Sequence, residues 1–229
     1  MIERECRAVA YDAIVFDMDG VLITGAGTSP ETYRRATTEL LSVFGHPEPT
    51  DWSSQLEDPS NADSFREACD RWDLPPEAAW AYKERAATDV ARARIAQGER
   101  TTYDDIEVVP TLADRYDLGI VSNNRIDTVQ YCADRFEWSW AEVCRGRFPT
   151  LTDFDARKPD PTYLEWAFDR MECETALYVG DRISDMMAAE RAGVDAALLT
   201  RSGKRDPESP IPTYEISSLR DLLELEAAG

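Results

Sequence analysis

Residues 13–22 have the sequence AIVFDMDGVL, an apolar run that ends in two aspartates and a glycine. The first four residues are apolar and partly β-branched, a composition typical of a buried strand. Asp17, Asp19 and Gly20 then predict a loop at the end of that strand. We therefore expect a strand over residues 13–16 that presents two carboxylates at its carboxyl end.

A purely helical segment follows this strand. No strand pattern occurs between residues 24 and 105, and Ser29 before a proline predicts the N-cap of a helix. We expect three helices, over residues 30–44, 61–72 and 76–97. A loop is expected over residues 46–60, which are rich in proline, serine and aspartate. Trp52, Trp72 and Trp80 are expected in the core of this helical part rather than in a substrate pocket.

From residue 106 onward, short apolar segments alternate with helical ones. We expect strands over residues 118–121, 142–144, 177–179 and 196–199. Helices are expected over residues 126–136, 161–171, 184–192 and 217–227. This alternation predicts an α/β fold, with a Rossmann-like parallel sheet, helices on both faces and a small all-helical domain. Residues 1–23 and 106–229 would form the α/β core, and residues 24–105 the helical domain.

The charge of the chain limits its partners. It has 45 acidic and 25 basic residues, a formal net charge of −20, and only three of the basic residues are lysines. This charge repels the nucleic-acid backbone and anionic membranes, so neither is an expected partner. The acidic residues are spread along the chain, which is typical of a halophilic protein whose self-repulsion is screened by salt. An acidic mesophilic protein from a GC-rich genome is the alternative.

The sequence lacks the features of a membrane protein, a disulfide-rich protein and a histidine-dependent enzyme. It has no run of about 18 apolar residues that predicts a transmembrane helix, and its charged N-terminus differs from a signal peptide, so we expect a cytoplasmic protein. The five cysteines form no C-x-x-C pair, which favours free thiols over a disulfide framework or a zinc site. His46 is the only histidine, which excludes histidine-based catalytic triads.

Polar side chains follow three of the expected strands at the points where the strands end. They are Asp17 and Asp19, then Ser122 and Asn123, then Asp181 with Asp185 four residues later. Lys158 lies in a loop that leads into the helix expected at 161–171. Because ligands bind beyond the carboxyl ends of the strands in an open parallel sheet, we expect these side chains to share one site.

The expected site combines carboxylates that repel one another with groups that suit a phosphoryl group. A hard divalent cation, Mg²⁺, would neutralise the carboxylates, because oxygen ligands suit this ion. Lys158 would add a positive charge, and Ser122 a hydroxyl donor. One aspartate of the Asp-x-Asp pair could attack phosphorus, and the other could act as general acid and base. Each feature alone has an ordinary explanation as a turn, a helix cap or a solvated charge, so the prediction depends on their joint occurrence.

In this order, the pieces resemble the haloacid dehalogenase superfamily of phosphohydrolases. The matching segments are residues 15–22, 120–123, 157–161 and 178–185, with the sequences VFDMDGVL, IVSN, RKPDP and YVGDRISD. The resemblance implies the phosphatase branch, similar to phosphoglycolate phosphatases, with a helical cap inserted between the first and second motifs. Residues 23–27 depart from the pattern, because they lack the acidic residue that many capped relatives carry there.

The resemblance also implies roles for the motif residues. Asp17 would be the nucleophile and Asp19 the general acid and base. Ser122 would hold the transferring phosphoryl group, with Asn123 as a further phosphate-binding residue. Lys158 would offset the negative charge of the phosphoryl group and of the nucleophile.

The acidic residues of the last motif are implied to bind metal. Asp181 would bind Mg²⁺ together with Asp17 and the main-chain carbonyl of Asp19. Asp185 would support Lys158 or the water shell of the metal. The dehalogenase branch lacks the second aspartate of the first motif, so the presence of Asp19 favours phosphate chemistry.

The implied function is hydrolysis of a phosphate monoester of a small metabolite through an aspartyl phosphate. A phosphomutase of the same fold is the nearest alternative, and it would hold a second phosphate and exclude water. A signalling receiver also uses a phosphorylatable aspartate, but it usually has adjacent acids on its first strand and no large insert. A scaffold that kept the fold without activity is the remaining alternative.

Overall fold

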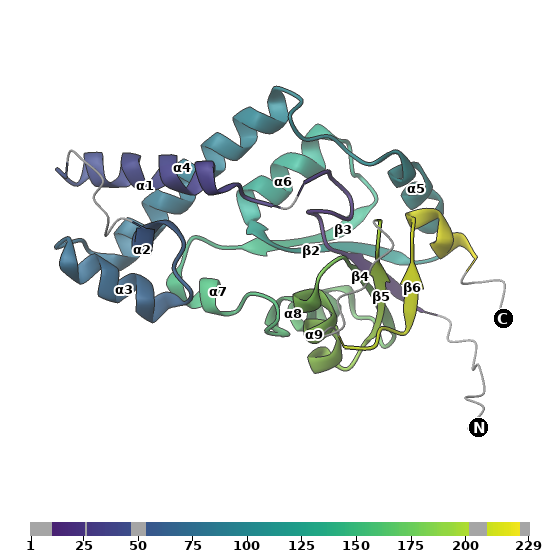
Figure 1. The fold of residues 1–229 in the computed structure, drawn as a ribbon. Helices are drawn as coiled ribbons and strands as arrows, with labels where there is room; N and C mark the ends of the chain where they lie inside the picture. The colour runs from purple at the N-terminus through teal and green to yellow at the C-terminus, as the bar shows by residue number, and fades with distance from the viewer. Residues whose placement is uncertain (1–10, 26, 47–53, 202–209, 225–229) are drawn as a thin grey trace.

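Six parallel strands form one sheet in the part of the chain that the structure describes. The structure is a computed structural model that describes residues 11–25, 27–46, 54–201 and 210–224. The strands are β1 (Ala13–Phe16), β2 (Asp117–Arg125), β3 (Ala141–Arg147), β4 (Ala176–Gly180), β5 (Asp195–Leu199) and β6 (Tyr214–Ile216). Their order is β3-β2-β1-β4-β5-β6, and every neighbouring pair is parallel (Figure 1). The predicted α/β class is confirmed.

Helices cover both faces of this sheet. The α-helices are α1 (Pro30–Val43), α2 (Ser54–Glu57), α3 (Ala62–Arg71), α4 (Pro76–Ala96), α5 (Val109–Leu112), α6 (Ile126–Arg135), α7 (Leu151–Asp155), α8 (Thr162–Met171) and α9 (Ile183–Ala192). Two 3₁₀ helices are η1 (Asp104–Val108) and η2 (Leu219–Leu223). Leu112 of α5, Val129 of α6 and Leu222 of η2 belong to one apolar cluster, and Leu164 of α8 and Met186 of α9 belong to a second. Every residue of β1 is buried between the two clusters, as expected for a central parallel strand.

The C-terminal part of the chain differs from the prediction. In place of a helix over residues 217–227, the structure has the 3₁₀ helix η2, and residues 225–229 lie outside the described range. Strand β6, which directly precedes this segment, was not predicted. β6 pairs with β5 and extends the sheet by one strand. The buried residues Leu219 and Leu222 are three apart, and a 3₁₀ helix places such residues on one face. The prediction was wrong because this spacing also fits an α-helix.

Other segments also have more regular structure than the prediction gave them, including β3, which is longer, and η1, α5 and α7, which were not predicted. β2 extends through the polar residues 122–124 to Arg125, although a loop was expected after residue 121. The short helix α2 lies within the loop predicted over residues 46–60. Polar residues therefore mark the end of the apolar part of β2 but not the end of the strand, and Ser122, Asn124 and Arg125 are buried as well.

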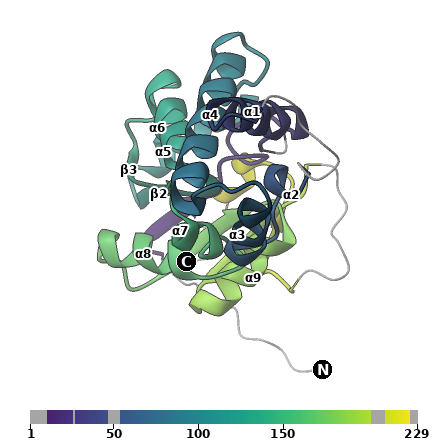
Figure 2. The ribbon, with the colours of Figure 1, turned by 90° about the vertical axis from the view of Figure 1, so that its left-hand side faces the viewer.

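The helices α1–α4 lie together beside the carboxyl ends of β1 and β2, and in Figure 2 they face the viewer. As predicted, Ser29 caps α1, because its Oγ accepts a hydrogen bond from the Thr32 N–H at 3.3 Å. Trp80 is 1% exposed and packs against Phe65 and Phe154, so its predicted place in the core is confirmed. Phe154 comes from α7, so this core includes a residue from beyond the insert.

The described cysteines are free thiols. Cys69 and Cys132 are buried, Cys144 and Cys173 are half-buried, and Cys6 lies outside the described residues. Burial raises the pKa of the Cys69 and Cys132 thiols to about 12. These two side chains therefore act as apolar packing groups. Over the same described ranges, none of the helices combines the length and the apolar character needed to cross a membrane.

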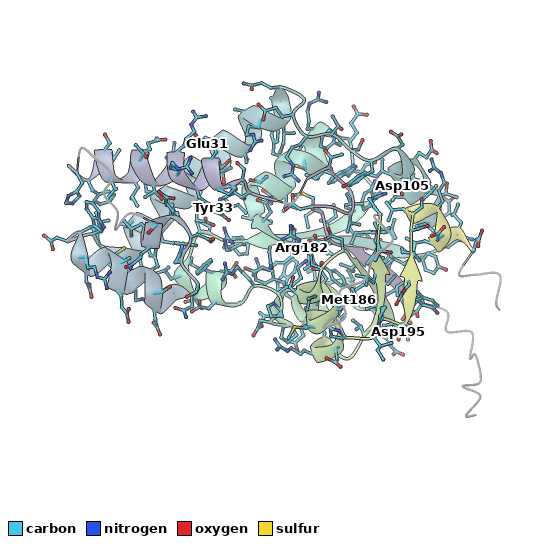
Figure 3. The ribbon with its side chains drawn as sticks, viewed as in Figure 1. Glu31, Tyr33, Asp105, Arg182, Met186 and Asp195 are labelled. Atoms are coloured by element: carbon cyan, nitrogen blue, oxygen red, sulfur yellow. The ribbon has the colours of Figure 1, made fainter. Side chains whose placement is uncertain are left out.

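The buried carboxylate of Asp105 links the loop after β1 to η2, which follows the edge strand β6. Asp105 of η1, labelled in Figure 3, accepts hydrogen bonds from the Arg201 guanidinium at 2.8 and 3.0 Å. It also accepts hydrogen bonds from Ser218 Oγ at 2.8 Å and Leu219 N at 2.9 Å. Arg201 in turn donates to the Val21 carbonyl at 2.7 Å. These contacts fix the loop that carries the first motif against η1 and η2.

A buried ion cluster joins α4 to the ends of two strands. Glu84 of α4 accepts two hydrogen bonds from Arg147 of β3, at 2.7 and 3.0 Å, and its Oε1 lies 3.3 Å from Nε of Arg125 in β2. The three side chains are only 3–4% exposed. Burial alone would raise the pKa of Glu84, but the two guanidinium groups outweigh it and the pKa lies below its usual value. Glu84 is therefore the counter-charge of two buried arginines.

Replacing Glu84 by Gln should lower the free energy of unfolding by about 3 kcal/mol or more, because two buried guanidinium groups lose their counter-charge. Urea denaturation followed by circular dichroism measures the change. Glu31→Gln is the control, since Glu31 pairs with Arg34 and both side chains are more than half exposed. This control should cost less than about 1 kcal/mol. Equal losses in the two variants would contradict the prediction.

Candidate active site

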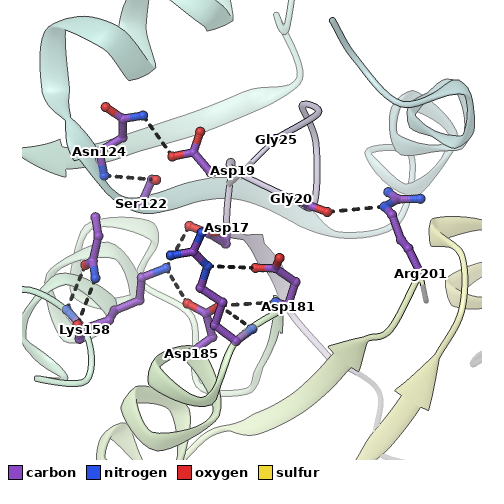
Figure 4. Close-up of polar contacts among 12 residues, drawn as sticks. Asp17, Asp19, Gly20, Gly25, Ser122, Asn124, Lys158, Asp181, Asp185 and Arg201 are labelled. Atoms are coloured by element: carbon purple, nitrogen blue, oxygen red, sulfur yellow. Dashed lines mark hydrogen bonds and ion pairs between the residues drawn. The ribbon is translucent and has the colours of Figure 1, made fainter. Parts of the chain in front are cut away.

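The strand order brings the predicted site residues to one edge of the sheet. β1 lies between β2 and β4, so Asp17 after β1, Ser122 in β2 and Asp181 after β4 meet at the carboxyl ends of adjacent strands (Figure 4). Asp17 and Ser122 are buried, and Asp181 is half-buried. This is the position at which ligands bind in open parallel sheets.

The ammonium group of Lys158 lies at the centre of the site. Its Nζ is 2.8 Å from Oδ1 of Asp17 and 2.6 Å from Oδ1 of Asp185. It also donates to the Val121 carbonyl at 3.2 Å and to the Tyr178 hydroxyl. Tyr178 was not among the predicted site residues, because an aromatic residue inside a buried strand is usually a core residue. The Lys158 side chain is 2% exposed, so its charge is balanced by protein groups rather than by water.

Burial shifts the pKa values of the charged groups. It raises the pKa of Asp17 to about 7 against the opposing effect of the Lys158 charge. Burial, followed by the negative charge of Asp185, raises the pKa of Asp181 to about 6. Burial also disfavours the Lys158 ammonium, but the charges of Asp17 and Asp185 outweigh it and its pKa lies above the usual value. One internal cation is thus shared among three carboxyl groups.

Three carboxyl groups lie close enough to hold one metal ion. Asp17, Asp181 and Asp185 each offer an oxygen, and these oxygens lie within 4.8 Å of one another. Oδ1 of Asp181 is buried and has no hydrogen-bond partner, and Nε of Arg182 lies 3.9 Å from it. A buried carboxylate oxygen that lacks a hydrogen bond and lies among other carboxylates fits a hard divalent cation. The cluster contains Asp185, which was predicted as an outer residue, and not the side chain of Asp19.

Two glycines permit this close packing of carboxylates. Gly20 has a φ of +88°, and a Cβ atom at this position would lie 2.2 Å from Oδ2 of Asp181. A Cβ atom at Gly180 would lie 2.3 Å from Cβ of Asp185. Any other residue at either position would displace an acidic side chain of the site.

The side chain of Asp19 points away from the cluster formed by Asp17, Asp181 and Asp185. Its Oδ2 accepts a hydrogen bond from Nδ2 of Asn124 at 2.9 Å, and its Oδ1 accepts one from Nη2 of Arg100 at 2.7 Å. Neither partner was predicted. Asn124 directly follows the predicted Asn123, so its place at the same strand end was a usable signal. Arg100 lies outside every motif, and no sequence signal pointed to it.

The second motif contributes in two ways. Ser122 is 1% exposed, and its Oγ accepts a hydrogen bond from the Asn124 N–H at 3.2 Å. The amide of Asn123 faces the main chain of Lys158, where it donates to the carbonyl and accepts from the N–H, both at 2.8 Å. The predicted contact of Asn123 with phosphate stays a prediction. In the structure its side chain holds the loop that carries Lys158.

Comparison with known proteins assigns a family. Residues 11–193 match the family of haloacid dehalogenase-like hydrolases. The chain is 40% identical over 100 residues to the D-glycero-β-D-manno-heptose-1,7-bisphosphate 7-phosphatase of Vibrio cholerae, an alignment that covers 42% of this chain and 50% of the relative. It is 42% identical over 71 residues to the phosphoglycolate phosphatase 1 of Pseudomonas aeruginosa, covering 29% of this chain and 26% of the relative. The chain thus spans about half or less of the length of these relatives.

The fold is also found in solved structures. The 2-haloacid dehalogenase of Pseudomonas syringae superposes with a TM-score of 0.62 at 20% sequence identity, over 94% of this chain and 98% of that chain. At this identity the likeness shows the fold alone. The match over most of the chain confirms the family that the four motifs predicted, and the protein belongs to the haloacid dehalogenase-like hydrolases.

Proposed function

We propose that the chain is a magnesium-dependent phosphatase that hydrolyses a monoester of a small phosphorylated metabolite through an aspartyl phosphate on Asp17. One observation carries the proposal: the Asp17 carboxylate lies beside both the Lys158 ammonium and the acidic cluster, with Asp19 two residues away. The two relatives named above as phosphatases support the same class of reaction. Asp19 favours phosphatase over dehalogenase chemistry, because the resemblance implies that the dehalogenase branch lacks it.

The first step would transfer the phosphoryl group to the protein. A carboxylate oxygen of Asp17 attacks phosphorus and forms a new P–O bond, while the bond from phosphorus to the ester oxygen breaks. The electron pair of that bond stays on the ester oxygen, which takes a proton from the carboxyl group of Asp19 and leaves as an alcohol. Lys158, 2.8 Å from Asp17, would offset the charge of the phosphoryl oxygens during the transfer.

The second step would release inorganic phosphate. Asp19, now a carboxylate, takes a proton from a water molecule as the water oxygen attacks phosphorus. The bond from phosphorus to Asp17 breaks, and its electron pair restores the Asp17 carboxylate. Ser122, buried within β2 directly after its apolar part, would donate its hydroxyl hydrogen bond to the phosphoryl group in both steps.

Asp17 and Asp181 would hold Mg²⁺, and the resemblance adds the main-chain carbonyl of Asp19. Asp185, whose Oδ1 is 2.6 Å from Lys158 Nζ, would keep the lysine in place and would support the water shell of the metal. When bound, Mg²⁺ supplies positive charge that stabilises the negative charge of the transferring phosphoryl group. The unpaired Oδ1 of Asp181 is the observation that supports this ligand set.

Two further parts of the proposal concern the helical insert and the environment. The insert, residues 24–105, would act as a cap that covers the substrate and sets its identity, as lids do by excluding water. A net charge of −20 would suit a cytoplasm with a high salt concentration, where screening weakens the self-repulsion of the chain. The activity assays below are therefore best performed in molar KCl.

Replacing Asp17 by Asn should abolish hydrolysis of p-nitrophenyl phosphate, with a loss of at least about 10³-fold in kcat, because the amide is a poor nucleophile toward phosphorus. Release of p-nitrophenolate measures the rate, and trapping of ³²P on the protein measures the intermediate. The wild-type chain should carry acid-stable label, and the variant should carry none. Wild-type activity in the variant would refute the assignment of the nucleophile.

Replacing Asp19 by Asn should lower kcat by about 10²–10⁴-fold, because neither the alcohol nor the attacking water then exchanges a proton with residue 19. Circular dichroism should give an unchanged melting curve, which separates this effect from a folding defect. The ratio of kcat/KM for p-nitrophenyl phosphate to that for ethyl phosphate should rise, since p-nitrophenolate leaves without a proton. An unchanged ratio would contradict a role of Asp19 as general acid.

Removal of divalent cations with EDTA should abolish activity, and addition of Mg²⁺ should restore it. Replacing Asp181 by Asn should raise the half-saturating Mg²⁺ concentration by at least about tenfold, because the cluster loses its unpaired carboxylate oxygen. Titration of activity against Mg²⁺ at constant KCl measures both effects. Full activity in excess EDTA would contradict the metal requirement.

A further inference from the structure

The carboxylate of Asp19 is held at both of its oxygens. Nδ2 of Asn124 donates to Oδ2 at 2.9 Å, and Nη2 of Arg100 donates to Oδ1 at 2.7 Å. The Asp19 and Arg100 side chains are 9% and 12% exposed, so water competes weakly for this ion pair. Asn124 is fixed in turn, because its Oδ1 accepts a hydrogen bond from the Arg125 N–H at 2.9 Å. The sheet supplies one of the two contacts to Asp19, and Arg100 supplies the other.

Arg100 lies where the chain returns from α4 to the α/β part. Its Nε donates to the Thr24 carbonyl at 2.7 Å, and its Nη2 also donates to the Gly25 carbonyl at 3.2 Å. Thr24 and Thr101 bind each other, through Thr24 N to the Thr101 carbonyl at 2.8 Å and through Thr101 N to Thr24 Oγ1 at 3.1 Å. The guanidinium of Arg100, a residue of the returning linker, therefore contacts the outgoing linker and Asp19 together.

The close approach of Arg100 to the outgoing linker is possible because residue 25 is glycine. Gly25 has a φ of +87°, and a Cβ atom there would lie 3.3 Å from Nε of Arg100. A side chain at this position would press on the guanidinium group that binds Asp19. Gly25 thus leaves room in the outgoing linker for the guanidinium group of Arg100. Arg100 itself lies outside all four motifs of the proposed site.

We propose that Arg100 is a positioning residue that fixes the orientation of the Asp19 carboxyl group, the proton donor of the proposed function, and links this orientation to the attachment of the helical insert. The inference rests on the function proposed above. The guanidinium group is planar, so binding Thr24 through Nε and Asp19 through Nη2 fixes the direction of the Asp19 contact. A movement of the two linkers therefore turns the Asp19 carboxylate.

Two phosphate esters separate this role from a structural one. kcat/KM reports the reaction up to departure of the leaving group, which is a stable anion in p-nitrophenyl phosphate and an alkoxide that requires a proton in ethyl phosphate. A badly aimed Asp19 therefore lowers kcat/KM for ethyl phosphate and leaves that for p-nitrophenyl phosphate nearly unchanged. A general distortion of the site lowers both values by the same factor.

Arg100→Ala should raise the ratio of kcat/KM for p-nitrophenyl phosphate to kcat/KM for ethyl phosphate at least about tenfold. This is a part of the roughly 10²–10⁴-fold effect of general acid catalysis. In the Asp19→Asn background the same substitution should leave the ratio unchanged, because Arg100 acts through Asp19. Arg100→Lys keeps the positive charge but has one donor nitrogen in place of the planar Nε and Nη2 pair, so it should raise the ratio as well. A wild-type ratio in Arg100→Lys would overturn the role of orientation.

Arg94→Ala is the matched control. Arg94 lies at the end of α4 and contacts Glu99 and Ser29, at 2.6 and 2.7 Å. This variant should keep the wild-type ratio, and hydrolysis of p-nitrophenyl phosphate shows that each variant is folded. An Arg100→Ala protein that loses both activities by the same factor would overturn the inference alone. A wild-type protein that hydrolyses neither ester would overturn the proposed function and this inference with it.

Discussion

A single buried ammonium group holds together carboxyl groups that come from separate parts of the chain. Lys158 lies in the loop before α8, whereas Asp17 follows β1, and Asp185 lies in α9. Taken out of water, the carboxylates would repel one another strongly, because the low local dielectric screens them poorly. Lys158 contacts two of the three carboxyl groups, and the third, Asp181, has the half-exposed Arg182 at 3.9 Å, so the site is short of buried positive charge. This shortage is the physical reason why a divalent cation would suit the site, as the proposed function requires.

The sheet explains why this cluster could be predicted from the sequence. A parallel strand that is buried on both faces is a short apolar run, and the first polar residue after it marks the carboxyl end. Asp17, Ser122 and Asp181 each stand at such a point, so local patterns located them without knowledge of the fold. The strand order β2-β1-β4 then makes the three ends neighbours. The order of the longer helices and of five strands was predictable for the same reason, whereas β6 and the short helices α2, η1, α5 and α7 were not predicted. At η2, a three-residue spacing of leucines fits more than one helix type.

The residues that support the site were not predictable, because their contacts join distant parts of the chain. Arg100 binds a carboxylate 81 positions away, and Glu84 binds Arg147 over 63 positions. An arginine in a polar linker and a glutamate on a helix are ordinary solvent-exposed residues in any local pattern. Tyr178 could not be recognised for the opposite reason. A tyrosine inside a strand has the pattern of a core residue, but the hydroxyl of Tyr178 contacts Lys158. Only the tertiary structure shows which polar groups are buried against one another.

The chain is similar in fold to a dehalogenase and in part of its sequence to proteins named as phosphatases, so the sheet alone does not select the reaction. In this chain the selection would depend on Asp19 and on what holds its carboxylate. The helical insert begins shortly after Asp19, and the chain returns from it through Arg100. Both linkers therefore pass beside the Asp19 side chain. Inserting a substrate-covering unit at any other strand would leave the proton-transfer group supported by the sheet alone. The position of the insert therefore links the part of the molecule that would recognise the substrate to the group that would move the proton.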